Sequence, residues 1–396
     1  MDQRDSGILL HISSLPSSFG IGDLGPQAYQ FADLMAQHNQ HFWQILPLNP
    51  TELDHGNSPY HSYATFAGNP LFISPQGLFQ QGLLERADLI AHRMPQLNQI
   101  HFEQVYESKG NLVDKAARKL TRLKTYQASL EQFCQRQAFW LDDYALFQVL
   151  RKQHPDRRWY EWPDSLKNRE QRTIQDLNKK LFHEIRHQKI IQYLFFKQWS
   201  DFKNYCHDKK IKIIGDMPIY VTDDSVDVWA HPELFKLNRD KRPLFKAGVP
   251  PDYFSQTGQL WGNPVYFWQQ HRKQHFDWWI KRIRQNLELV DLLRIDHFRG
   301  LVAYWEIPAE EKTAIKGKWV KGGGKPFFEM LQNYFPELPF IAEDLGIITD
   351  DVTAAMNRLK LPGMRVLQFA FDEHFPHSIH LPHEYIPNCV VYTGTH

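Results

Sequence analysis

The sequence has few cysteines and no long apolar run, and neither sign of charge dominates it. Its 396 residues include 3 Cys, and the wide spacing of Cys134, Cys206 and Cys389 excludes a disulfide framework and a paired-cysteine metal knuckle. Lys and Arg number 46 against 45 Asp and Glu, a formal net charge of +1, so the charge balance favours neither nucleic acid nor an anionic membrane surface. The charged amino terminus leads into no apolar signal segment, and no window is long and apolar enough to cross a bilayer. We therefore expect a cytoplasmic protein with no nucleic-acid or membrane partner.

Apolar segments of strand length alternate with helical patterns along much of the chain. Residues 7–12 and 41–46 are typical of buried strands, and residues 28–38 between them carry apolar side chains at helical spacing. A strand, helix, strand order favours a parallel sheet with crossover helices. Further strands are predicted at 211–218, at 290–293 leading into a charged motif, and at 340–346, 364–371 and 388–394. A chain of this length accommodates one large α/β barrel or two to three smaller domains.

The charged motif Arg294-Ile295-Asp296-His297-Phe298-Arg299-Gly300 is the strongest chemical signal. Side chains alternate along a strand, so Arg294 and Asp296 share a face at the strand's carboxyl end. A neighbouring guanidinium is expected to hold the Asp296 carboxylate ionised, the state that a nucleophilic glycosidase carboxylate requires. Taken alone, the pattern favours an ordinary Arg–Asp ion pair at a strand end, because such pairs are common.

This motif and seven others resemble those of the amylomaltase family, the 4-alpha-glucanotransferases of glycoside hydrolase family 77. The other segments that carry the resemblance are 7–25, 43–48, 58–60, 214–218, 248–264, 342–346 and 392–396. The resemblance implies a (β/α)8 TIM-type barrel with inserted helical subdomains. It also implies a retaining enzyme that transfers a segment of an α-1,4-glucan to the 4-hydroxyl of another glucan or of glucose. The implied partners are maltooligosaccharide or α-1,4-glucan donors and acceptors, and the chemistry needs no cofactor.

By resemblance, Asp296 is the nucleophile and Glu343 the proton donor. Strand alternation lets only one of Glu343 and Asp344 point into the barrel mouth, which leaves Asp344 for a structural hydrogen bond. The substrate contacts implied by the resemblance are Tyr60, Asp216, Trp261, Asn263, Arg294, His297 and His396.

The expected organisation has three parts. Residues 1–74 form the first part of the barrel with a donor-site loop. Residues 75–207 show long helical periodicities and few strand signals, so we expect an inserted, mainly helical subdomain. Residues 208–396 supply strands three to seven, with an active-site lid near 247–264, where glycine, proline and aromatic residues indicate a long functional loop.

The sequence departs from the family pattern at its end. In the family an Asp follows the histidine equivalent to His396 and serves as a third catalytic carboxylate. That Asp and the eighth strand are absent from the given chain, which we therefore expect to be an inactive, open barrel. Two alternatives to the transferase remain at this point: an α-glucan hydrolase of the α-amylase clan, and a non-catalytic glucan-binding fragment.

Four histidines near the carboxyl end recur at every third position: His374, His377, His380 and His383. This spacing suggests a metal site, but Pro376 and Pro382 interrupt any helix that would align the imidazoles. No cysteine or acidic set completes a coordination shell. The sequence therefore predicts no metal.

Overall fold

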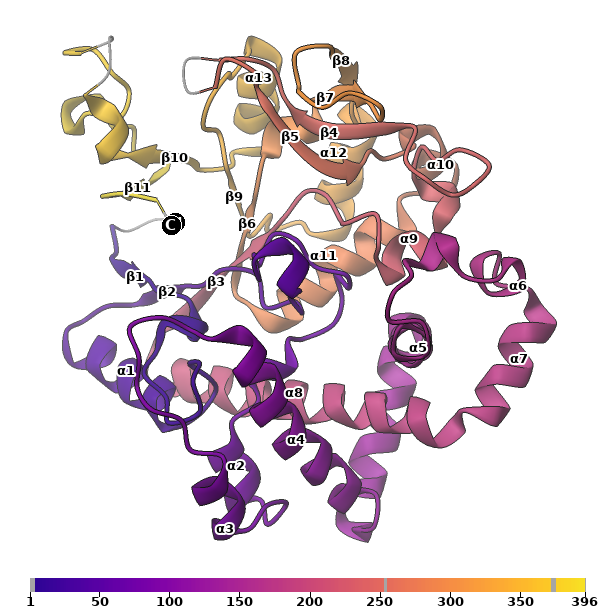
Figure 1. The fold of residues 1–396 in the computed structure, drawn as a ribbon. Coiled ribbons are helices and arrows are strands. Elements are labelled where there is room, and N and C mark those ends of the chain that lie inside the picture. The colour runs from indigo at the N-terminus through magenta and orange to yellow at the C-terminus, as the bar shows by residue number, and fades with distance from the viewer. Residues whose placement is uncertain (1–3, 253–254, 372–374, 396) are drawn as a thin grey trace.

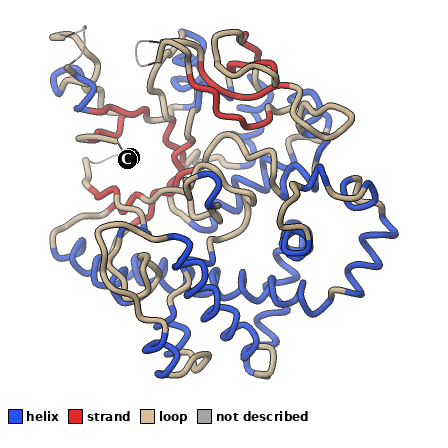
Figure 2. The backbone as a smooth tube through the Cα atoms, in the orientation of Figure 1, coloured by secondary structure: helices blue, strands red, loops and turns tan. Residues whose placement is uncertain are grey.

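The computed structural model describes residues 4–252, 255–371 and 375–395 (Figure 1). Its centre is a five-stranded parallel sheet in the order β1-β2-β3-β6-β9, followed by a parallel pair, β10 and β11. These seven strands are β1 (Gly7–Leu9), β2 (Phe42–Gln44), β3 (Lys212–Met217), β6 (Leu292–Ile295), β9 (Phe340–Ala342), β10 (Gly363–Val366) and β11 (Cys389–Tyr392). Figure 2 shows the strands in the left and upper parts of the view and most of the helices below and to the right of them.

Contacts beyond the strand pairs show that the sheet curves. The Ala342 amide of β9 donates to the Pro362 carbonyl, just before β10, at 2.9 Å. The Tyr392 hydroxyl of β11 donates to Gln44 of β2 at 2.7 Å, so the last described strand faces one of the first. Parallel strands joined by helices and curved in this way form an α/β barrel, which confirms the predicted fold class.

Helices connect successive barrel strands: α1 (Pro26–Gln37), α11 (Asp277–Leu289), α12 (Gly324–Tyr334) and α13 (Asp350–Leu359). Their ends follow ordinary helix rules. Pro26 occupies the first turn of α1, where its missing N–H leaves no bond unmade. Asp350 and Asp351 begin α13, where their charges complement the positive end of the helix dipole.

The regular elements between residues 75 and 208 are all helices: α2 (Pro75–Gln80), α3 (Arg86–Ala91), α4 (Phe102–Leu120), α5 (Lys124–Gln153), α6 (Asp164–Lys167), α7 (Gln171–Lys180) and α8 (Phe182–Asp208), with one short 3-10 turn (Trp159–Glu161). The carboxyl half of α8 packs on the barrel, where Phe202 meets Trp43 edge-on at 5.5 Å. α8 therefore ends the helical region and also serves as the crossover helix between β2 and β3. One hydrophobic core spans both parts, so the boundaries at 75 and 207 remain a proposal.

A second sheet was missed by the sequence interpretation. It is antiparallel, in the order β5-β4-β7-β8, and its strands are β4 (Phe245–Val249), β5 (Gln259–Pro264), β7 (Ala303–Pro308) and β8 (Lys318–Lys321). The prediction of a continuous loop over 247–264 was therefore wrong. Gly248 pairs with Trp305 of β7, and only the segment 250–258 connects β4 to β5. Tyr253 and Phe254 in that segment lie outside the described residues.

The predicted sixth strand is also shorter than expected. Residues 363–366 pair with β11, but Leu367–Ala370 forms a 3-10 helix. The apolar run thus continues past Val366, where the hydrogen-bonded pairing of β10 with β11 ends. Apolar content alone does not mark the end of the strand.

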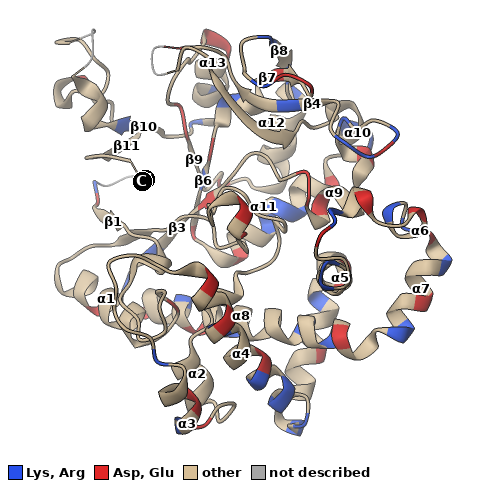
Figure 3. Ribbon diagram, in the orientation of Figure 1, with Lys and Arg blue, Asp and Glu red and all other residues tan. Residues whose placement is uncertain are grey.

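The outer helices carry mixed charge: Figure 3 shows basic and acidic residues interspersed along them. In the described parts of the chain, no helix has both the length and the apolar composition needed to span a bilayer.

The short remaining helices are α9 (Val226–Ala230) and α10 (Trp268–Lys273).

Candidate active site

A buried ion pair joins two neighbouring barrel strands. β3 and β6 run parallel in a register that sets Asp216 opposite Arg294. Arg294 Nη1 contacts both carboxylate oxygens of Asp216, at 2.7 and 2.8 Å, and the two side chains are 5% and 0% exposed. The pair lies at the carboxyl ends of the strands, where barrel enzymes assemble their sites.

Asp296 follows the last residue of β6 and shares the same guanidinium. Arg294 Nη2 lies 3.0 Å from Asp296 Oδ1, and the Asp296 side chain is 28% exposed, so a substrate atom can reach it. Burial raises the pKa of Asp296 to about 7; Arg294 opposes this rise, while Asp216 and Glu343 add to it. The predicted ion pair is confirmed. Burial thus acts against the ionised state that the Arg294 guanidinium favours, and the expected ionisation of Asp296 stays a prediction.

Glu343 follows β9 in the same way. The register pairs Ile295 with Ala342, so Asp296 and Glu343 occupy the next positions on neighbouring strands. The Glu343 carboxylate accepts two backbone hydrogen bonds, from the His297 amide at 2.8 Å and from the Leu345 amide at 2.7 Å. Burial raises the pKa of Glu343 despite these donors and Arg294.

Asp344 points away from this cluster. Its Oδ1 accepts from the Met364 amide at 2.6 Å, and its Oδ2 lies 3.3 Å from Arg365 Nη1. The expected structural hydrogen bond of Asp344 is confirmed. Alternation along the strand end thus separates the two adjacent acids, as predicted.

Aromatic and polar side chains surround the carboxyl groups. The Tyr60 hydroxyl donates to Asp216 Oδ2 at 2.6 Å. The ring of Trp261, carried by β5, meets the His297 ring edge-on with centroids 4.8 Å apart. Burial lowers the pKa of His297 to about 3, so its imidazole is neutral, and among the described residues its buried Nε2 has no hydrogen-bond partner. A contact between this imidazole and a sugar stays a prediction.

Asn263, another of the predicted contacts, is bonded to backbone. Asn263 is 7% exposed and its amide nitrogen donates to the Val221 carbonyl at 2.9 Å, so this nitrogen is already engaged by backbone. His396 lies outside the described residues, as does His374 of the histidine series. Among the described residues no group of three or more His, Cys, Asp or Glu is placed to hold a metal.

Sequence reasoning missed Tyr392 and Gln44 as neighbours of the site. Burial raises the pKa of Tyr392 to about 12, with Arg294 and Asp216 close enough to influence it. Both residues belong to segments that carry the family resemblance. Their hydrogen bond joins strands almost 350 residues apart, and no local pattern predicts such a bond.

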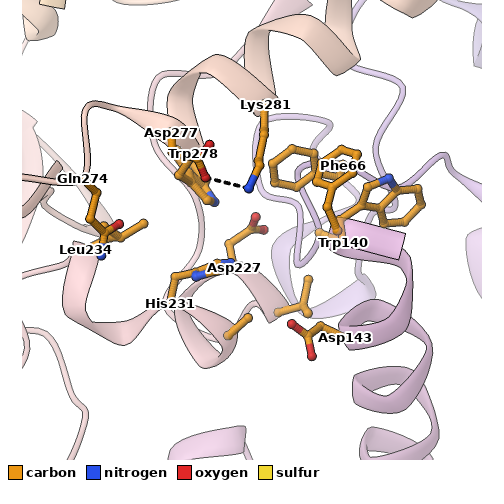
Figure 4. Close-up of a pocket in the computed structure, with 14 residues that line it drawn as sticks. Phe66, Trp140, Asp143, Asp227, His231, Leu234, Gln274, Asp277, Trp278 and Lys281 are labelled. Carbon is orange, nitrogen blue, oxygen red and sulfur yellow. Dashed lines mark ion pairs between the residues drawn. The ribbon is translucent and has the colours of Figure 1, made fainter. Parts of the chain in front are cut away.

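A separate cavity of about 70 Å³ lies between α5, α9 and α11. Figure 4 shows Phe66, Trp140 and Trp278 around it, with the Asp227 carboxylate at its centre. The predicted site residues are absent from its lining. We therefore assign the chemistry to the strand ends and not to this cavity.

The Asp227→Asn variant is expected to be more stable than the wild type at pH 8 but not at pH 4. Asp227 is 3% exposed and accepts the Thr65 amide at 2.9 Å, and burial raises its pKa from 3.8 to about 6. The folded state then binds this proton more tightly than the unfolded state. Stability falls as the pH rises from about 4 to about 6, by at most about 3 kcal/mol.

Asparagine keeps an acceptor for the Thr65 amide and removes the buried charge. Thermal melts of both proteins at pH 4 and pH 8 measure the effect. A Tm difference that does not change with pH would contradict the assigned pKa.

Comparisons with known proteins agree with this geometry. The family model described as 4-alpha-glucanotransferase matches residues 10–396. A 4-alpha-glucanotransferase of Aquifex aeolicus is 49% identical over 393 residues, which cover 99% of this chain and 79% of the relative. One from Thermus thermophilus is 44% identical over 397 residues, 99% of this chain and 78% of the relative.

Solved structures give the same result. The amylomaltase from Streptococcus agalactiae in complex with acarbose superposes with a TM-score of 0.95 at 40% identity, covering 99% of this chain and 79% of that one. The amylomaltase from Corynebacterium glutamicum gives a TM-score of 0.79 at 20% identity, covering 99% of this chain and 54% of that one. This likeness concerns the fold alone.

Proposed function

This chain belongs to the 4-alpha-glucanotransferase family, glycoside hydrolase family 77, and on that premise we propose that Asp296 and Glu343 perform the two half-reactions of glucan transfer. The protein is a transferase that uses α-1,4-glucans as donor and acceptor. Its high-identity relatives are 4-alpha-glucanotransferases, which disfavours the hydrolase alternative. The observation that supports the residue roles is the placement of two carboxyl groups at adjacent strand ends, one of them paired with Arg294.

In the first half-reaction Asp296 attacks the anomeric carbon while Glu343 protonates the departing glucan oxygen. The product is a covalent glycosyl-enzyme with inverted configuration at that carbon. Asp296 must be ionised and Glu343 protonated, so one proton resides on the pair. The raised pKa of Glu343 favours its protonated form, and Arg294, 3.0 Å from Asp296, favours placing the negative charge on Asp296.

In the second half-reaction Glu343 acts as a base. It deprotonates the 4-hydroxyl of an incoming glucan, which attacks the anomeric carbon and releases Asp296, restoring the α configuration. Two carboxyl groups suffice for these steps, so no cofactor is needed. Acceptor sugar must reach the intermediate before water does, which requires side chains that bind glucan and exclude solvent.

We assign those side chains from the contacts around the pair. Trp261 and Tyr60 are partly exposed and are the side chains that we expect to meet a sugar first, with His297 against Trp261 and the buried Asp216 bonded to Tyr60. Aromatic faces with nearby hydrogen-bonding groups suit pyranose rings. The solved relative from Streptococcus agalactiae is in complex with acarbose, which supports a sugar-binding role for the equivalent site here.

The same proposal gives roles to the larger parts of the chain. Residues 1–74 contribute the first strands and the loop with Tyr60, the helical region 75–207 borders the barrel, and 208–396 contributes the reacting carboxyl groups. The β4–β5 hairpin within 247–264 acts as the lid, because it carries Trp261 to His297.

Incubation of maltotriose with the full-length protein is expected to give glucose and a ladder of longer maltooligosaccharides. Transfer conserves the number of glycosidic bonds, so the concentration of reducing ends should stay constant while the chain-length distribution broadens. Chromatography of the products and a reducing-end assay measure both quantities. Rising reducing ends without longer products would identify a hydrolase and overturn the transferase proposal.

A further inference from the structure

The two backbone segments behind the carboxyl groups are tied together beyond the sheet. The β6–β9 ladder ends at Ile295 and Ala342. Beyond this ladder, the residues that follow Asp296 in the sequence form the 3-10 turn Phe298–Leu301. The residues that follow Glu343 form the irregular segment 344–349.

Arg299 connects these segments. Its side chain is buried, 5% exposed, and its Nη1 donates a hydrogen bond to the Ile347 carbonyl. The guanidinium carbon lies 3.8 Å from the centre of the Trp319 ring of β8, a cation–π contact that fixes the plane of the guanidinium. Arg299 therefore extends from the nucleophile's turn to the acid's segment in one orientation.

The segment after Glu343 is held at its start by the Asp344 carboxylate, which is bonded to the Met364 amide and paired with Arg365, and by the packing of Leu345 and Ile348 on the core; around residue 347 it has fewer anchors. Gly346 and Ile347 are exposed, with Ile347 at 47%. Among the described residues, the backbone of 344–348 makes two hydrogen bonds: the Leu345 amide donates to Glu343 Oε1 at 2.7 Å, and the Ile347 carbonyl accepts from Arg299. The anchor at Ile347 is two residues from the amide that Glu343 uses.

We propose that Arg299 is a positioning residue for glucan transfer: by holding the Ile347 carbonyl, it keeps the Leu345 amide where it orients the Glu343 carboxyl. This inference rests on the proposed role of Glu343. Arg299 touches neither substrate nor reacting atoms; it acts through the geometry of the acid and base.

The consequence is a selective loss of proton transfer. A displacement of about 1 Å at a reacting group costs on the order of 100-fold in rate. Steps in which Glu343 gives or takes a proton should slow by that factor, whereas steps that need only Asp296 should continue.

The test compares donors and acceptors that differ in their need for a proton. Maltotriose needs Glu343 as acid and base. α-Maltotriosyl fluoride expels fluoride, which leaves without protonation, and azide attacks the glycosyl-enzyme without a base. When the glycosyl fluoride and azide are both present, Asp296 attacks the anomeric carbon and fluoride departs. Azide then displaces Asp296 from the glycosyl-enzyme to give α-maltotriosyl azide.

We expect Arg299→Met to lower kcat/KM for maltotriose about 100-fold but to lower fluoride release in the presence of azide less than about fivefold. Arg299→Lys, which keeps the charge and the stem but lacks the planar fork, should show the same split with a smaller loss. Glu343→Gln is the reference for a missing acid and base.

Arg169→Met is the matched control. Arg169 also stacks on a tryptophan, 4.1 Å from the Trp229 ring centre, and pairs with an acid, Asp143, but it lies in the helical region. Its substitution should leave both donor rates near wild type while lowering Tm, which measures the cost of losing a partly buried arginine that stacks on a tryptophan.

Three outcomes decide the inference. The split in Arg299→Met and Arg299→Lys, together with the same split in Glu343→Gln, supports it. Equal slowing with both donors would show that Arg299 only supports the fold or the nucleophile, and this overturns the proposal while leaving the roles of Asp296 and Glu343 intact. Absence of azide rescue in Glu343→Gln would remove the role of Glu343 and the proposal with it. Arg299→Lys decides the question if Arg299→Met does not melt cooperatively.

Discussion

The Asp296→Asn variant is expected to fold like the wild type and to lose at least four orders of magnitude in turnover of maltotriose. A carboxamide cannot form the glycosyl-enzyme, and removing a covalent nucleophile costs about 10⁴- to 10⁶-fold. The fold should tolerate the change, since the side chain is 28% exposed and Arg294 keeps its bonds to Asp216. Replacing a carboxyl group whose pKa burial raises to about 7 also removes an unfavourable charge.

Rates of maltotriose disproportionation and thermal melts measure these two effects. Asp227→Asn is the control, because it changes another aspartate whose pKa is raised by burial without touching the strand ends. If Asp296→Asn kept more than about a tenth of the wild-type rate, the double-displacement mechanism would be excluded for this residue.

The Glu343→Gln variant is expected to lose about 10²- to 10⁴-fold with maltotriose, but to release fluoride from α-maltotriosyl fluoride in a first turnover close to wild type. The first step with fluoride needs the nucleophile but no acid. The second step still needs a base, so steady turnover should recover only when azide is added.

This substitution also has a structural cost. Both Glu343 oxygens accept backbone amides, from His297 and Leu345, whereas a glutamine offers one oxygen and one NH2 group. One of the two backbone amides would then face the NH2 group of the glutamine instead of an acceptor, so we expect Tm to fall. Rates should therefore be compared below the temperature at which the variant melts. A variant that transfers from maltotriose at the wild-type rate would exclude Glu343 as the acid.

The pH profile of the fluoride reaction should change in a defined direction. The Glu343 carboxylate adds to the raised pKa of Asp296. Without that negative neighbour, Asp296 ionises at lower pH, so the acid limb of first-turnover fluoride release should move to lower pH in Glu343→Gln. In the wild type the two carboxyl groups titrate together, and the limbs of its profile belong to the pair.

The order of parallel strands was predictable because each one is a short apolar run between helical patterns. The β4–β5 hairpin was not, because its strands are rich in glycine and proline: Gly248, Gly262 and Pro264 suggest a loop. Its β4 strand pairs with β7, and the paired residues are about 60 positions apart in the sequence. Pairing between distant segments decides such cases, and local propensity does not.

The acids themselves were identified from motifs, but their environment was not. Alternation correctly separated Glu343 from Asp344. The bond between Arg294 and Asp216 joins residues 78 positions apart, and only the strand register brings them together. The direction of the Asp296 pKa shift depends on burial, which neighbouring residues in the sequence do not show.

The double engagement of Arg294 bears on how long the covalent intermediate survives. One guanidinium serves two carboxylates, Asp216 through Nη1 and Asp296 through Nη2. When Asp296 becomes an ester and loses its charge, Arg294 is still paired with the Asp216 carboxylate, so no unpaired positive charge remains in the barrel. The same shared cation then attracts Asp296 strongly enough to help it depart as a carboxylate, but less strongly than an unshared one would. Because Arg294 is shared between two carboxylates, Asp296 is both a competent attacking group and a competent leaving group. The lifetime of the ester then determines how long an acceptor glucan has to arrive.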